Sequence, residues 1–205
     1  MLKSVKKLLI LLLAASLLAS VPVSSPLLRK VEAASAASKN RAAKKAYKKI
    51  RKKLLKKSTG LSYKLCDLTG DGVYEMFVQY DPKTGGPSLQ AVYTFRSGKA
   101  KKALGTRIYG LDKIYVYKKS KSLILRGRGH GGEQYVYFKM SGRKYKRAAS
   151  RARQAIAGGH WENGPWYYYS GSDRAISRSG FRSRIKGIKS GSCKTLKPLK
   201  WTYYG

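Results

Sequence analysis

From residue 61 to residue 170 the chain alternates short aromatic or β-branched segments with clusters of Ser, Gly, Lys and Asp. Such segments are typical of strands, and the clusters between them are typical of turns. The strand-like segments recur too few times to form the blades of a closed propeller. We therefore expect a single meandering antiparallel sheet. Its strands are predicted at 62–66, 75–80, 88–95, 101–108, 112–117, 122–127, 134–140, 144–149 and 166–170.

A basic amphipathic helix is predicted before these strands, over 37–60. Its apolar residues recur at three- and four-residue steps: Ala43, Tyr47, Ile50 and Leu54, with Leu55 widening the stripe. Residues 44–57 carry nine Lys or Arg and no acid, and Gly60 is suited to ending the helix. The stripe either packs on the sheet or lies on an anionic membrane. We favour packing, because the stripe ends where the strand pattern begins.

A second, short helix is predicted near 178–189. Ser177 or Ser179 can cap it, and one face carries three apolar residues: Phe181, Ile185 and Ile188. The tail, 190–205, has room for a last strand, although its Pro and Gly content leaves that open. The predicted fold class is β-rich α+β: an antiparallel meander of Tyr-rich hairpins with an N-terminal helix and a short C-terminal helix. Residues 61–205 form the β-rich domain.

Residues 1–36 have the pattern of a secretory signal peptide. A basic start (1–7) precedes an apolar run at 8–19. That run is too short to cross a ~30 Å hydrocarbon core, which needs about 20 residues. Small residues then allow cleavage near Ala33 or Ala36. We expect a secreted protein associated with the cell envelope.

The chain is strongly basic. It has 45 Lys and Arg against 9 Asp and Glu, a formal net charge of +36. This charge favours polyanions as partners and says little about the fold. Because export removes nucleic acid as the default partner, we expect an anionic wall polymer or membrane surface instead, bound by a monomer.

Three of the scarce acids fall in one nine-residue loop, 67–75, with the sequence DLTGDGVYE. A calcium loop places oxygen ligands at alternate positions, and a glycine at the sixth position permits its sharp turn. The candidate ligands are four side chains and one carbonyl oxygen, at Asp67, Thr69, Asp71, Val73 (the carbonyl) and Glu75. Thr69 is a poor ligand and the surroundings are positive, so we expect weak, structural calcium binding. The alternative is an Asp-Gly turn whose carboxylates accept backbone hydrogen bonds and balance lysines.

This loop, flanked by apolar strands, resembles the calcium loops of FG-GAP-type and related EF-hand-like extracellular repeats. Val78 stands where a helix–loop–helix site has its bidentate Glu, so the loop is a strand–loop–strand variant. Residues 42–189 resemble small uncharacterised exported proteins of Gram-positive bacteria. The shared features are the Lys-rich helix with its AYKK element (46–49), the loop, Tyr-rich hairpins such as 92–99, and Ile-Ser-x-Ser (176–179) before the last helix. The resemblance implies an extracellular, calcium-linked, β-rich module without enzymatic activity.

Three smaller features leave alternatives open. His130 and Glu133, joined by His160, could form a metal or acid–base site of a hydrolase, although a glycine-rich connection explains them equally. Segment 161–172 resembles one unit of the aromatic hairpin repeats that bind choline or glucans on cell walls, or it packs its aromatic rings in the sheet. Cys66 and Cys193 either pair outside the cell or stay free.

The function predicted from these features is that of an exported, non-enzymatic envelope module. A structural calcium loop would stabilise it, and its cationic surface would bind anionic wall polymers. One alternative is a membrane-active cationic protein acting through helix 41–57. Another is a cell-wall protein that binds choline or glucan through its aromatic hairpin.

Overall fold

The computed structural model describes residues 26–85, 88–129, 131–154, 164–196 and 202–203. The chain divides into two compact units, 1–38 and 39–205. The described part of the first unit, 26–38, is helical and belongs to α2 (Pro26–Leu55). The basic start and the apolar run of the predicted signal peptide lie outside the described residues. In the described ranges, neither helix has the length and hydropathy needed to span a membrane.

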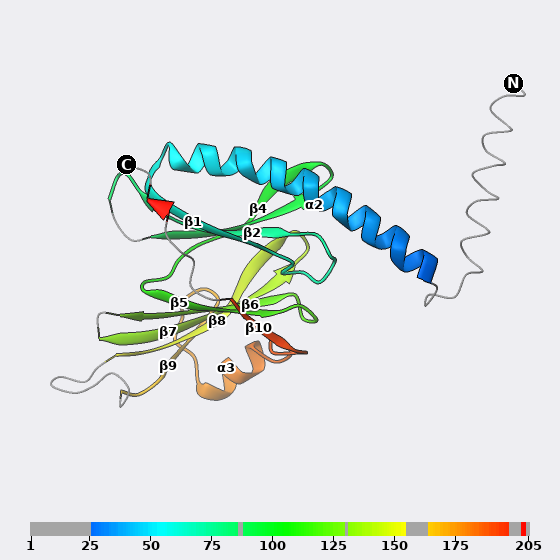
Figure 1. Ribbon diagram of the computed structural model, residues 1–205. Helices are drawn as coiled ribbons and strands as arrows, with labels where there is room; N and C mark the ends of the chain where they lie inside the picture. Colours follow the sequence, from blue (N-terminus) through cyan, green and yellow to red (C-terminus); the bar gives the residue numbers. More distant parts are fainter. Residues whose placement is uncertain (1–25, 86–87, 130, 155–163, 197–201, 204–205) are drawn as a thin grey trace, which may run out of the picture. The chain divides into compact units, whose positions relative to one another are not determined.

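The second unit contains two antiparallel sheets, which Figure 1 shows as two layers. Sheet A has the order β11-β1-β2-β3-β4 and sheet B the order β10-β5-β6-β7-β8-β9. The strands of sheet A are β1 (Ser58–Cys66), β2 (Glu75–Pro82), β3 (Leu89–Arg96), β4 (Lys99–Arg107) and β11 (Thr202–Tyr203). Those of sheet B are β5 (Leu111–Tyr117), β6 (Ser122–Gly129), β7 (Gly132–Ser141), β8 (Lys144–Gln154), β9 (Tyr167–Ser170) and β10 (Cys193–Leu196).

The predicted fold class is confirmed, and a strand is present at each of the nine predicted places. The expected single sheet is wrong, because the meander breaks after β4 and β5 starts a second sheet. Gly110 lies in this break with a φ of 54°, and a Cβ there would lie 1.7 Å from the carbonyl oxygen of Arg128. Because glycine has no side chain and readily adopts a positive φ, the chain can pass close to β6 where it crosses from sheet A to sheet B.

The two sheets bury their facing sides against each other. Sheet A contributes Phe77, Val92 and Leu104 to this shared core. Leu123 and Leu125 of sheet B belong to the same buried cluster. Removing this much apolar surface from water is the main force that holds the layers together.

Residues 39–55 of α2 cover the outer face of sheet A (Figure 1). Ala43 and Tyr47 are buried there against Met76 and Val78, so packing of the apolar stripe on the sheet is confirmed. The helix differs from the predicted range, 37–60, at both ends. It begins at Pro26 and ends at Leu55, and β1 starts at Ser58, whose hydroxyl donates 2.9 Å to the carbonyl of Leu54.

The outer face of sheet B is partly covered by α3 (Arg178–Arg184). Ser177 caps this helix as predicted, and its hydroxyl accepts a 3.1 Å hydrogen bond from the Gly180 amide. Phe181 and Ile188 are buried against Tyr137 in the middle of the sheet. The helix is shorter than the predicted 178–189, because Ile185 leaves helical geometry.

Candidate functional site

The predicted calcium loop joins β1 to β2, and Glu75 points into the protein rather than toward solvent. Only 2% of Glu75 is exposed. Its Oε2 accepts a 2.7 Å hydrogen bond from the amide of Leu68, and its Oε1 accepts a 3.2 Å bond from the hydroxyl of Thr69. Thr69 is buried with it. Both carboxylate oxygens of Glu75 are therefore engaged by the loop itself.

The other two acids of the loop also have protein partners. Asp67 accepts a 2.7 Å hydrogen bond from the Gly70 amide through Oδ1, and its Oδ2 lies 2.7 Å from the Nζ of Lys118. Asp71 Oδ1 accepts a 2.9 Å bond from the amide of Val73. These contacts are those of the alternative interpretation, an Asp-Gly turn whose carboxylates hold backbone amides and balance a lysine.

Helix α2 fixes this loop from outside. The side chain of Asn40 donates to the carbonyl of Gly72 at 2.9 Å and accepts from the amide of Tyr74 at 2.6 Å. The hydroxyl of Tyr47 donates to the carbonyl of Tyr74 at 2.9 Å. Sequence reasoning missed Asn40, although its place three residues before Ala43 puts it on the same face as the apolar stripe.

The pKa of Glu75 is raised to about 7, because burial and the charges of Asp71 and Asp67 outweigh the hydrogen bonds from Leu68 and Thr69 that lower it. The carboxylates that a calcium ion would need, those of Asp67, Asp71 and Glu75, here accept protein hydrogen bonds, and Asp67 also pairs with Lys118. Within the described residues, no three His, Cys, Asp or Glu side chains are grouped so that they could hold a metal ion. Calcium binding by loop 67–75 stays a prediction.

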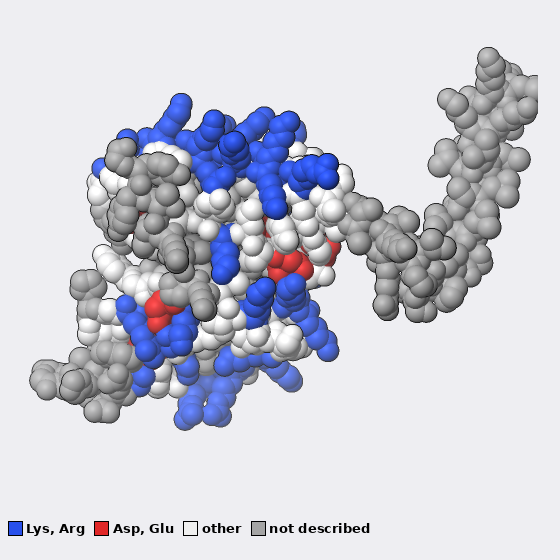
Figure 2. All heavy atoms as spheres, in the orientation of Figure 1, with Lys and Arg blue, Asp and Glu red and all other residues white. Residues whose placement is uncertain are grey.

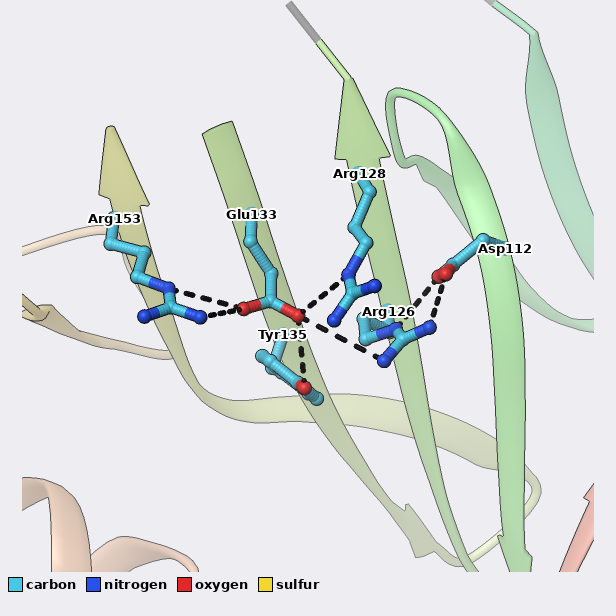
Figure 3. Close-up of polar contacts among 6 residues, drawn as sticks. All are labelled: Asp112, Arg126, Arg128, Glu133, Tyr135 and Arg153. Atoms are coloured by element: carbon cyan, nitrogen blue, oxygen red, sulfur yellow. Dashed lines mark hydrogen bonds and ion pairs between the residues drawn. The ribbon is translucent and has the colours of Figure 1, made fainter. Parts of the chain in front are cut away.

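A second acidic group lies on sheet B, where Glu133 of β7 is almost fully buried among arginines (Figure 3). The register places Arg128 of β6 and Arg153 of β8 directly opposite it. Arg128 Nε donates to Oε1 at 3.0 Å, and Arg153 Nη2 donates to Oε2 at 2.9 Å. The hydroxyl of Tyr135 adds a 3.1 Å bond to Oε1, and Arg126 Nη1 lies 3.9 Å from the same oxygen.

The arginines decide the charge of Glu133. Burial alone would raise its pKa, but the hydrogen bonds from Arg128, Arg153 and Tyr135 outweigh burial and lower it. Arg126 in turn donates through Nε to Asp112 at 2.9 Å (Figure 3). Glu133 is thus an ionised carboxylate with both oxygens occupied, which suits a structural acid more than an acid–base catalyst. The other members of the suggested hydrolase site, His130 and His160, lie outside the described residues.

Trp166, in the aromatic segment 161–172, contacts two of the basic side chains of β8. The guanidinium carbon of Arg151 lies 4.2 Å from the centre of the Trp166 ring and 4.6 Å from that of Tyr135. The guanidinium carbon of Arg153 lies 4.7 Å from the Trp166 ring. These cations already hold the place that a choline group would take on the ring. Residues 161–163 of this segment lie outside the described residues.

The scarce acids are engaged by contacts within the chain, and they are too few to balance the basic residues. Each acid whose side chain is described has a hydrogen-bond or ion-pair partner within the chain: Asp67, Asp71, Glu75, Asp81, Asp112, Glu133 and Asp173. The lysines between 44 and 57, on α2 and directly after it, are exposed. Figure 2 shows Lys and Arg gathered along the helix, with acidic atoms confined to small areas.

The two cysteines are not bonded to each other. Cys66 is buried beside the shared core and Cys193 is exposed on β10. Burial, followed by the charge of Glu75, raises the pKa of Cys66 to about 12. Cys66 therefore stays a protonated, unreactive thiol at neutral pH.

Comparison of the chain with protein-family models, with curated proteins and with solved structures found no match. Two features bear on the function: the unbalanced lysines of α2, and the arginines and aromatic rings on the outer face of sheet B.

Proposed function

We propose that this protein is an exported, non-enzymatic module of the cell envelope that binds anionic wall polymers through its cationic surface. The observation that carries the proposal is that each described acid already has a hydrogen-bond or ion-pair partner within the chain. Because the described carboxylates hold backbone amides, hydroxyls, arginines or Lys118, the lysines of α2 face solvent without counter-charges. The pattern of residues 1–36 supports export.

The helix presents these lysines in a fixed arrangement. Tyr47 is 1% exposed and is bonded to the loop carbonyl of Tyr74, so the helix cannot turn its basic side away from solvent. A polyanion with repeated charges can contact several lysines of such a row at once. Each contact releases counterions, so the affinity depends steeply on salt.

The same packing favours a polymer over a membrane as the partner. An amphipathic helix binds a bilayer by burying its apolar face in the interface. In α2 that face is already occupied by sheet A, through Ala43, Tyr47 and partly buried Ile50, Leu54 and Leu55. Insertion would require the helix to leave the sheet, whereas a polymer can bind the exposed lysines without any rearrangement.

The proposal is tested by measuring binding of the full chain to a polyglycerol phosphate polymer over a range of salt concentrations. The helix variant K45Q/K48Q/K49Q/K52Q should weaken binding about tenfold or more and lower the salt slope. The matched control K119Q/K139Q/K144Q/K146Q removes the same charge from exposed lysines of sheet B and its β5–β6 turn, and it should weaken binding less.

Equal losses in the two variants would show that net charge acts without a defined surface. Equal binding to neutral dextran, or no binding to the anionic polymer, would overturn the proposal. Leakage of anionic vesicles at the same protein concentrations would instead favour the membrane-active alternative through helix 41–57.

A further inference from the structure

The outer face of sheet B contains a cavity of about 230 Å³. Its lining consists of four tyrosines, one isoleucine and two basic residues: Tyr115, Tyr117, Tyr135, Tyr137, Ile124, Arg151 and Lys189. Among the residues that the structure describes, no acidic side chain lines it. The cavity is thus positive in charge and rich in phenolic hydroxyls.

Strand alternation explains why the tyrosines gather there. Their chain neighbours in β5 and β7, such as Ile114 and Val136, belong to the core shared with sheet A. Residues one place along a strand point to the opposite face. The register sets Tyr115 beside Ile124 and Ile124 beside Tyr137, so the tyrosines of β5 and β7 flank Ile124.

The hydroxyls of Tyr115, Tyr117 and Tyr137 remain hydrogen-bond donors at neutral pH. Burial raises the pKa of Tyr115 and Tyr137, and burial together with Cys193 raises the pKa of Tyr117 to about 12. A neutral phenol can donate to an oxyanion, whereas a phenolate would repel it.

Arg151 supplies the positive charge in a fixed position. Its guanidinium carbon contacts two aromatic rings, at 4.6 Å from the centre of Tyr135 and 4.2 Å from the centre of Trp166. Its Nε is buried and has no hydrogen-bond partner among the described residues, which is costly for a charged donor. Lys189, on the segment after α3, is exposed at the edge of the cavity and adds a second cation.

We propose that this cavity binds a single anionic unit of a hydroxylated polymer: a phosphate or carboxylate carried on a polyol or sugar. Arg151, Lys189 and the tyrosine hydroxyls other than that of Tyr135, which donates to Glu133, would hold the oxyanion and neighbouring hydroxyls, and the ring faces would contact the carbon chain. The volume lies below the roughly 300–1,000 Å³ of pockets for drug-sized ligands, so one unit fits rather than several. This inference rests on the proposed function and names the group that the cavity recognises within the polymer.

The test is calorimetric titration of the full chain with glycerol 1-phosphate, glucuronate, glycerol and glucose. The two anionic probes separate a phosphate source from a carboxylate source, and the tighter of the two identifies it. The neutral probes should bind at least about tenfold more weakly, because they lack the charge-assisted hydrogen bonds.

Two variants locate the site. K189Q removes the cation at the edge of the cavity, and Y117F removes one hydroxyl while keeping its ring. Each should lower the affinity for the tighter-binding anionic probe about tenfold or less. The matched control K186Q removes an exposed lysine of the same segment that does not line the cavity, and it should leave the affinity unchanged. Neither variant touches Arg151, whose stacking also holds the strands together.

Equal effects of K189Q and K186Q would overturn the inference, as would equal binding of neutral and anionic probes. If neither anion binds while the full chain still binds the polymer in a salt-dependent way, the cavity proposal fails and the proposed function stands. If the polymer itself does not bind but a small anion does, the proposed function fails and the cavity remains an anion site.

Discussion

Two buried glutamates of this protein have pKa values displaced in opposite directions by their surroundings. Glu75 is held by an amide and a hydroxyl near two other carboxylates, and burial raises its pKa to about 7. Glu133 is equally buried, but arginines on both neighbouring strands lower its pKa. The charge state of a buried acid is thus set by the donors around it and not by burial alone.

Glu75 predicts a pH dependence of stability in the presence of a chelator. A carboxyl whose pKa is higher in the folded state binds its proton more tightly there, so wild type gains stability as pH falls through about 7 toward 4.5. E75Q keeps the shape without the charge, and its free energy of unfolding should exceed that of wild type by about 3 kcal/mol near pH 8.5, falling to about 1 kcal/mol near pH 5 and vanishing below about pH 4. Urea unfolding at these pH values measures this difference. A difference that does not change with pH would contradict the raised pKa.

Calcium provides the control for that experiment. Calcium needs the ionised carboxylate, so its binding would raise the melting temperature of wild type near pH 8 and not that of E75Q or D71N. Identical melting of wild type with calcium and with chelator would show that Asp67, Asp71 and Glu75 serve the turn alone.

At the scale of the element, the two sides of α2 have different roles. Tyr47 is buried against sheet A and bonded to Tyr74, whereas Lys48 is exposed. Y47A should lower the free energy of unfolding by roughly 3–5 kcal/mol, because it opens a large cavity and leaves a carbonyl unpaired. K48A should change it by less than about 0.5 kcal/mol. Denaturant unfolding of both variants measures these changes, and similar small effects would mean that the helix does not pack on the sheet.

The sequence allowed the elements to be predicted, because alternation and helical spacing are local properties. The division into two sheets was not predictable in this way, since Tyr115 and Ile114 alternate equally well in one sheet or two. The partners of Glu133 also depend on register: Arg128 and Arg153 meet it only because β6 and β8 flank β7. Likewise, the acids of loop 67–75 can be recognised in the sequence, but the hydrogen bonds that Asn40 makes to the loop backbone cannot, because Asn40 lies far away along the chain.

At the scale of the whole molecule, the net charge of +36 acts against folding. The folded chain holds its cations closer together than the unfolded chain does, so their mutual repulsion costs more in the folded state. The described acids cannot offset this cost broadly, because each is committed to a local contact. Salt shortens the range of the repulsion from about 30 Å at 0.01 M to about 8 Å at 0.15 M.

The melting temperature should therefore rise by several degrees when sodium chloride is increased over that range, as scanning calorimetry of the full chain would show. The helix variant K45Q/K48Q/K49Q/K52Q should melt higher than wild type at low salt and gain less from added salt, because four of the repelling charges are gone. Sucrose of equal osmolality separates screening from general solute exclusion, since it leaves the charges unscreened. A melting temperature that falls with salt would mean that ion pairs such as those of Glu133 outweigh the repulsion. In that case the lysines of α2 would not destabilise the fold, and a bound polyanion would not stabilise it by neutralising them.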